Sequence, residues 1–213
     1  MIKLDILSDP ICPWCYIGKT RLEKALADVP DHPFVIEWHP FQLNPDMPAE
    51  GMDRRTYLET KFGGKENAVR VYGEIEKHAR EDGLDLDFGA IQKTPNTVDA
   101  HRLIHWAGIE GKQDEIVNAL FTAYFHEGRD IGSREVLCDI ADSCGLDAAV
   151  IGKLLKSDED VDMIRKRDTH SREMGVNSVP TFIIANQHAV PGAQPADLWI
   201  KVIEELKEKE ANA

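Results

Sequence analysis

The first forty residues change from a strand pattern to a helical pattern and back. Residues 2–8 (IKLDILS) alternate and then run apolar, as a buried strand does. From Pro13 to Leu26 the apolar positions recur at helical spacing, and a proline suits the first turn of a helix. A second strand is predicted over residues 34–41 (FVIEWHPF). The pattern therefore predicts a β-α-β unit at the N-terminus.

The middle of the chain shows helical periodicity only. Strand signals stop after the LNPDMP stretch and return near residue 180. The helices predicted between them cover residues 53–62, 66–82, 97–110, 113–126, 134–144, 147–155 and 158–174. Two strands follow at 181–185 and 188–190, and then a C-terminal helix. This final part predicts a β-β-α unit, which together with the first unit can complete a mixed sheet.

Composition and charge narrow the range of functions. The 213 residues are 42% hydrophobic and 30% charged, as in an ordinary globular protein. Asp and Glu outnumber Lys and Arg by 38 to 25, and the formal charge of −13 disfavours a nucleic-acid partner. The start, MIKLDILSD, lacks the pattern of a secretory signal, and no apolar run approaches the ~20 residues of a membrane span. We therefore expect a cytoplasmic protein with no membrane partner.

Two of the 4 cysteines, Cys12 and Cys15, stand in the sequence CPWC between the first strand and the first helix. Half of a zinc site, a structural disulfide and a redox pair are the three alternatives. A permanent disulfide is rare in a reducing compartment. Structural zinc needs a second ligand pair, but Cys138 and Cys144 are separated by five residues rather than two to four. The redox interpretation is favoured.

The position of Cys12 gives that interpretation a mechanism. Cys12 is predicted at the N-terminus of the helix, where free backbone N–H groups and the helix dipole stabilise a thiolate. Cys15 lies one turn further and is close enough to attack a mixed disulfide on Cys12. The two cysteines are therefore predicted to have different roles.

Pro180 opens a strand that otherwise reads as buried, although proline cannot donate to a strand ladder. A cis bond between Val179 and Pro180 explains this position, because it turns the backbone sharply. The turn would leave backbone groups of Val179 free to pair with an extended peptide beside the reactive sulfur.

Taken together, these motifs resemble those of the DsbA family, and more narrowly its FrnE-like branch of disulfide oxidoreductases and isomerases. The matching stretches are SDPICPWCYIGK (8–19), WHPFQLNPDMPAEG (38–51), TPNTVDAHRLIHWA (94–107) and GVNSVPTFII with VPGAQP (175–195). The resemblance implies an α/β thioredoxin fold with an inserted all-helical domain. It predicts a discontinuous thioredoxin-fold domain of residues 1–45 and 171–213. The helical insertion would cover 46–170 and include the helix that crosses back to the sheet.

The resemblance also implies a thiol-disulfide oxidoreductase or isomerase in which Cys12 attacks and Cys15 resolves. Protein or small-molecule disulfides would be its substrates, and glutathione a possible co-substrate. No metal and no permanently bound cofactor are expected. Substrate contacts are predicted at Pro13, Trp14, Val179, Pro180 and Thr181. Glutathione or the wider groove is expected to contact Asn96, His101 and Gln194. Trp14 is expected to be exposed in the redox loop, where DsbA-like oxidants carry a histidine.

Two other functions stay open. 2-Hydroxychromene-2-carboxylate isomerase and kappa-class glutathione transferase share this architecture and use glutathione, but a serine usually stands where this chain has Cys12. A non-catalytic, chaperone-like module that binds client proteins is the third alternative.

Two remaining pairs of residues are interpreted as structural. His101 and His105 have the i, i+4 spacing of metal ligands, but no third ligand accompanies them, so satisfied polar roles are preferred. Six residues along one helix would separate Cys138 from Cys144 by about 9 Å and by well over a right angle around the axis. We therefore expect both to be buried thiols of the core rather than a second redox pair.

Overall fold

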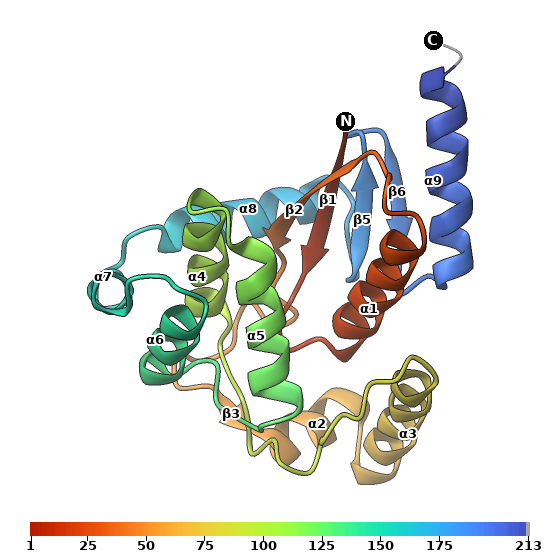
Figure 1. Ribbon diagram of the computed structural model, residues 1–213. Coiled ribbons are helices and arrows are strands. Elements are labelled where there is room, and N and C mark those ends of the chain that lie inside the picture. The colour runs from red at the N-terminus through yellow and green to blue at the C-terminus, as the bar shows by residue number, and fades with distance from the viewer. Residues whose placement is uncertain (212–213) are drawn as a thin grey trace.

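A four-stranded mixed sheet lies at the centre of the computed structural model, which describes residues 1–211 (Figure 1). Its strand order is β2-β1-β5-β6. β1 (Ile2–Ser8) pairs in parallel with β2 (Phe34–Pro40) and antiparallel with β5 (Thr181–Ile184), which pairs antiparallel with β6 (His188–Pro191). The strand predictions are confirmed to within a residue; β1 and β5 are mostly buried, whereas β6 is an exposed edge strand.

Helices cover the sheet on both sides (Figure 1). α1 (Pro13–Asp28) packs against α9 (Ala196–Ala211) on one side. On the other side α4 (Val98–Ile109) and α8 (Val161–Glu173) contact β2. Because the sheet is covered on both sides, the central strand β5 reads as an almost continuous apolar run, and β1 becomes apolar after its alternating start.

The remaining helices belong to the segment inserted between β2 and β5. They are α2 (Arg54–Phe62), α3 (Lys65–Glu81), α5 (Gln113–Phe125), α6 (Arg134–Ser143) and α7 (Ala148–Leu154). The α/β thioredoxin fold with a helical insertion is thereby confirmed.

The sequence predicted an all-helical insertion, and this is wrong in part. Two very short strands, β3 (Met52–Asp53) and β4 (Lys93–Thr94), pair antiparallel beside α2. A pair of two-residue strands has no room for the alternation that reveals a strand in a sequence. The predicted domain boundary at position 171 falls inside α8, so this helix is shared between the two parts of the predicted division.

The exposed edge of β2 is covered by a side chain of α5. The Trp38 amide donates to Gln113 Oε1 at 2.8 Å, and Gln113 Nε2 donates to the Trp38 carbonyl at 3.2 Å. The glutamine thus pairs with the strand as a neighbouring strand would, which protects an edge that could otherwise recruit another chain.

Tyr16 joins the first helix to the insertion. Its ring stacks on Phe121 of α5 with centroids 4.8 Å apart, and its hydroxyl lies 3.0 Å from His126 Nε2. Since Tyr16 directly follows Cys15, this contact fixes the start of α1 against the inserted helices.

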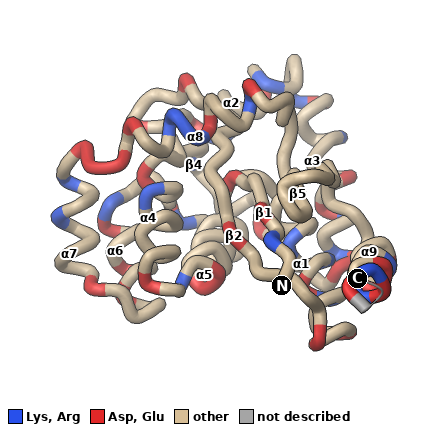
Figure 2. The backbone as a smooth tube through the Cα atoms, turned by 90° about the horizontal axis from the view of Figure 1, so that it is seen from above, with Lys and Arg blue, Asp and Glu red and all other residues tan. Residues whose placement is uncertain are grey.

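Charged residues of both signs are interspersed along the helices, while the strands are mostly uncharged (Figure 2). In the described part of the chain, every helix is too short or too polar to cross a bilayer.

Candidate active site

The turn between β1 and α1 places Cys12 at the N-terminus of a helix. Cys12 is the N-cap of α1, with φ −90° and ψ 113°, and Pro13 follows at the first helical position. The Cys12 amide donates to the Asp9 carbonyl at 2.9 Å, and the Cys12 carbonyl accepts from the Cys15 amide at 3.0 Å. The Cys12 side chain makes no capping hydrogen bond, so the positive end of the helix is available to a negative charge on its sulfur.

The two sulfurs of the CPWC motif are buried and are not joined by a disulfide. Cys12 is 4% exposed and Cys15 is 1% exposed. Burial raises the pKa of the Cys15 thiol well above its usual value, and a hydrogen bond with Cys12 and the charge of Cys12 raise it further. Ser8 and the backbone of Asp9 oppose this increase. Cys15 is therefore a protonated thiol that can donate to the sulfur of Cys12.

The turn before β5 lies against Cys12. The Val179–Pro180 peptide bond is cis, as predicted. The Cys12 thiol donates to the Val179 carbonyl over a distance of 3.7 Å, so this carbonyl has a partner rather than being free. Thr181 is buried, and its hydroxyl donates to the Ser178 carbonyl at 2.8 Å. Two segments 167 residues apart therefore meet at the sulfur of Cys12.

Gly18 allows α1 to approach this turn closely. A Cβ atom at position 18 would lie 2.8 Å from Pro180 Cγ and 3.3 Å from Ala193 Cα. Contacts that short are repulsive, so any larger residue would push the helix and the turn apart. This role could not be predicted from the sequence, because a glycine inside a helical pattern signals only a weak helix former.

Trp14 was expected to be exposed, and this is wrong in part. The side chain is partly buried, and its ring lies 5.3 Å from the ring of His78 on α3. The insertion therefore reaches the redox loop and contacts one of its two middle residues. A substrate contact of Trp14 remains a prediction.

Asp9 and His101 form a buried titratable pair next to the redox loop. Asp9 is 0% exposed, and burial raises its pKa to about 7, although the amides of Leu43 (2.7 Å) and Ile11 (3.3 Å) donate to its carboxylate. Burial lowers the pKa of His101 to about 4. His101 Nε2 lies 4.0 Å from Asp9 Oδ1. The structure thus places His101, predicted to contact the groove, in the interior beside Asp9.

The other two residues predicted for the groove are used within the protein. Asn96 Nδ2 donates to the Met47 carbonyl at 2.6 Å, and its Oδ1 accepts from the Val98 amide at 3.0 Å. This second bond gives a partner to the first amide of α4, whose N-cap residue is Thr97. Gln194 Nε2 donates to the Pro191 carbonyl at 2.7 Å. A role of either residue in binding glutathione remains a prediction.

Within the described residues, the cluster that could offer three ligands to a metal is Asp5, Glu37 and His39. Both carboxylates already form ion pairs with a lysine of the protein, because Lys3 Nζ lies 2.9 Å from Asp5 and 2.9 Å from Glu37. The cluster is therefore well described as an ion-pair network at the surface of the sheet.

The second pair of cysteines is less buried than the sequence predicted. Cys138 on α6 and Cys144 at the C-cap of α6 are free thiols. They were expected to be fully buried, but both are only partly buried at the edge of the core. α6 is a short helix at the surface, so positions on its apolar stripe are incompletely covered.

The chain matches known proteins over nearly its whole length. The model of the DSBA-like thioredoxin domain family matches residues 3–204. The crystal structure of the probable DsbA oxidoreductase SCO1869 from Streptomyces coelicolor has a TM-score of 0.85 and 28% identity, with 96% of this chain and 89% of that chain covered.

Two solved structures at lower identity share the fold. That of 2-hydroxychromene-2-carboxylate isomerase has a TM-score of 0.76 at 16% identity, covering 99% of this chain and 98% of that chain. The structure of the cytosolic disulfide reductase DsbM from Pseudomonas aeruginosa with GSH has a TM-score of 0.67 at 18% identity. The match covers 97% of this chain and 99% of that chain.

Proposed function

The chain belongs to the DSBA-like thioredoxin domain family, and on this premise we propose that it is a thiol-disulfide oxidoreductase whose working group is the Cys12–Cys15 dithiol. The observation that carries the proposal is the position of Cys12. Its sulfur stands at the N-terminus of α1 and 3.7 Å from the carbonyl that precedes the cis Pro180.

In the first step, the Cys12 thiolate attacks one sulfur of a substrate disulfide. The substrate S–S bond breaks, a Cys12–substrate disulfide forms, and the other substrate sulfur leaves as a thiolate that takes up a proton. Residues that favour a negative charge on Cys12 assist this step. The two groups that do so are the backbone amides at the N-terminus of α1 and the thiol of Cys15, which donates toward Cys12.

In the second step, Cys15 gives up its proton and attacks the sulfur of Cys12. The mixed disulfide breaks, the second substrate thiol is released, and a Cys12–Cys15 disulfide remains. Two glutathione molecules can reduce this disulfide and leave as glutathione disulfide, so that atoms and electrons balance over the cycle. Running the same steps backwards oxidises a dithiol, and the potentials of the partners decide the direction.

The substrate groove is proposed beside the turn at Val179 and Pro180. Once Cys12 has lost the proton that it donates to the Val179 carbonyl, an extended peptide or the backbone of glutathione would pair with the backbone of Val179 while its sulfur meets Cys12. Trp14 would line the same groove from the redox loop. A cytoplasmic location, in which glutathione is abundant, stays a prediction from the sequence.

Insulin reduction with glutathione as the electron donor tests this proposal. We expect turnover by the wild type and the rate of the buffer control for a Cys12→Ala/Cys15→Ala variant. The matched control is Cys138→Ala/Cys144→Ala, which also removes two thiols and should keep the wild-type rate. If the Cys12→Ala/Cys15→Ala variant still suppressed aggregation of an unfolded client and the wild type reduced nothing, the chaperone-like alternative would replace this proposal.

The glutathione-dependent isomerase alternative makes a different prediction for a single variant. Those relatives usually carry a serine at the position of Cys12, so isomerisation of 2-hydroxychromene-2-carboxylate should survive in Cys12→Ser. Disulfide exchange should be lost in the same variant, because serine cannot form a disulfide.

A further inference from the structure

Arg54 is a buried cation without an anionic partner. It opens α2 and is 6% exposed. Its guanidinium donates to the hydroxyl of Tyr72 at 2.7 Å and to those of Thr94 and Tyr124 at 3.3 Å each. Its Nε is buried and lacks a partner, and in the described part of the chain no carboxylate lies within 4.0 Å of this guanidinium.

The hydroxyl partners do not neutralise that charge. Burial raises the pKa of Tyr72 and of Tyr124, so both remain neutral phenols. An arginine keeps its charge inside a protein, and removing it from water costs several kcal/mol unless a counter-charge compensates. The position of Arg54 is therefore one that an anion would stabilise.

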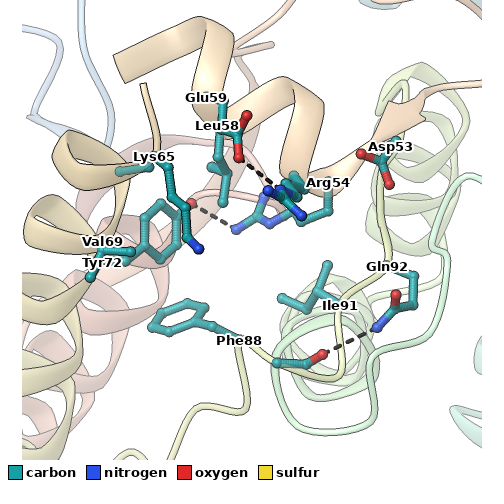
Figure 3. A pocket seen from close by; sticks show the side chains of 13 residues that line it. Asp53, Arg54, Leu58, Glu59, Lys65, Val69, Tyr72, Phe88, Ile91 and Gln92 are labelled. Carbon is teal, nitrogen blue, oxygen red and sulfur yellow. Dashed lines mark hydrogen bonds and ion pairs between the residues drawn. The ribbon is translucent and has the colours of Figure 1, made fainter. Parts of the chain in front are cut away.

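A cavity of about 410 Å³ lies beside Arg54, between α2, α3 and the segment before β4 (Figure 3). This volume falls in the range of small-molecule sites. Its apolar walls come from three elements and comprise Leu58, Ala68, Val69, Tyr72, Phe88 and Ile91. Figure 3 shows Arg54 reaching from α2 toward the Tyr72 hydroxyl, with Phe88 and Ile91 on the opposite side of the cavity.

The acidic residues at the cavity are already engaged. Glu59 pairs with Arg55 at 2.8 Å. Asp53 caps α2 by accepting from the Thr56 amide at 2.9 Å. Lys65, by contrast, has no ion pair among the described residues, and Figure 3 shows its ammonium group pointing toward the cavity. It starts α3, whose N-cap Gly64 offers no side-chain hydrogen bond. The cavity therefore has unmatched positive charge at one end and apolar walls at the other.

We propose that the Arg54 cavity binds a small carboxylate with an apolar or aromatic body. The carboxylate would be held by Arg54 and Lys65, and the body would pack on Val69, Phe88 and Ile91. No cysteine lines this cavity, but its wall approaches the dithiol, because the charge of Cys12 contributes to raising the pKa of Tyr72.

Isothermal titration calorimetry with 3-phenylpropionate on the reduced protein tests the proposal. The neutral isostere 3-phenylpropanamide is the matched ligand control. We expect the acid to bind at least about tenfold more tightly than the amide, which corresponds to about 1.4 kcal/mol. We expect inorganic phosphate, which has no apolar body, to bind more weakly than the acid. Equal affinities for acid and amide, or phosphate binding as tightly as the acid, would overturn the proposal.

Variants locate the binding to this cavity. Arg54→Met should remove the binding, but it also breaks contacts that join three elements, so circular dichroism must first show a folded protein. Lys65→Ala removes an exposed charge and should weaken binding about threefold. Lys77→Ala removes the same charge from the same helix at a position that does not line the cavity, and should bind as the wild type does.

A second surface variant keeps the test independent of Arg54. Val69 is 64% exposed and lines the cavity, so Val69→Glu brings a negative charge to it with little risk to folding. We expect this variant to lose most of the affinity for 3-phenylpropionate. If Lys65→Ala and Val69→Glu both bound the acid as Lys77→Ala does, the acid would be binding elsewhere and the proposal would fail.

Discussion

The molecule carries two pairs of cysteines on helices, and they are opposite in almost every physical respect. Cys12 caps the N-terminus of α1 and Cys15 lies in its first turn, whereas Cys138 is in the middle of α6 and Cys144 caps its C-terminus. A helix N-terminus favours a negative charge, but a C-terminus, with its free carbonyl groups, disfavours one. Burial, and then the charge of Asp139, raise the pKa of Cys138.

Under the proposed function, exposure is a poor guide to the redox site of this protein. Cys12 and Cys15 are almost completely buried, and Cys138 and Cys144 are the more exposed pair. What distinguishes the first pair is its place at a helix N-terminus and against the turn at Val179 and Pro180. Chemistry follows from the backbone that surrounds a sulfur rather than from access to solvent alone.

The largest effect should come from separating the two members of the first pair. We expect Cys12→Ser to reduce insulin at the rate of the buffer control. Cys15→Ser should instead accumulate a mixed disulfide with glutathione, because its Cys12 can attack but nothing resolves the product. Mass spectrometry after an acid quench measures the adduct. Adducts on Cys15 in the Cys12→Ser protein, with turnover intact, would reverse the assignment.

The next effect tests whether the turn at Pro180 must touch the redox helix. Gly18→Ala places a Cβ atom 2.8 Å from Pro180 Cγ, so the turn has to move away from Cys12. We expect a several-fold slower exchange rate and a loss of about 1–3 kcal/mol in the free energy of unfolding.

Gly73→Ala is the matched control for this variant. Gly73 is also a helical glycine, but its added Cβ would meet nothing within 4 Å. It should stabilise the protein by about 0.5–1 kcal/mol and leave the exchange rate unchanged. If Gly18→Ala behaved as Gly73→Ala does, the close approach would have no functional role.

A moderate effect is expected from the buried acid next to the first pair. Since the folded-state pKa of Asp9 is raised from 3.8 to about 7, its contribution to stability is greatest below pH 4 and is lost as the pH rises toward 7. The pKa of His101 is lowered from 6.5 to about 4, so its contribution to stability increases as the pH rises over nearly the same range. The two contributions should largely cancel in the wild type.

Asp9→Asn removes one of the two opposing contributions. Urea unfolding at pH 5 and pH 8 should then show stability rising with pH, by on the order of 1–3 kcal/mol more than in the wild type. His101→Gln should show stability falling over the same interval. Identical pH dependences in the wild type and both variants would mean that the pair does not titrate in this range.

The smallest effect is expected at the second pair of cysteines. Cys138→Ala/Cys144→Ala should change the exchange rate by less than about twofold, because helix geometry separates the two sulfurs and the C-terminus of α6 disfavours a thiolate. A loss of most of the insulin-reducing activity in this variant would establish a second redox pair.

The sequence predicted well what depends on periodicity and local backbone chemistry. The strand at 2–8, the helix from Pro13 and the cis bond before Pro180 all follow from patterns within a few residues. Contacts between distant segments were not predictable in this way. The meeting of Gly18 with Pro180 and the packing of Trp14 on His78 arise only when the C-terminal unit and the insertion each pack against α1.

Three further features of the structure could not be read from the sequence, for local reasons. The two-residue strands β3 and β4 are too short to show alternation. The burial of Cys138 and Cys144 was overestimated because an apolar stripe shows which face of a helix is covered, but not how completely. The buried charge of Arg54 left no trace in the sequence, where an arginine in the first turn of a helix reads as exposed.

We propose that Cys12 and Cys15 are the redox pair and that Cys138 and Cys144 are not. Equilibrating the wild type in glutathione buffers of graded potential, followed by acid quenching and mapping of disulfides by mass spectrometry, tests it most directly. We predict a single disulfide, between Cys12 and Cys15, that forms and disappears in one two-electron transition with the potential of the buffer. A Cys12–Cys15 pair that stays reduced throughout, or a disulfide between Cys138 and Cys144 that titrates in its place, would contradict the account.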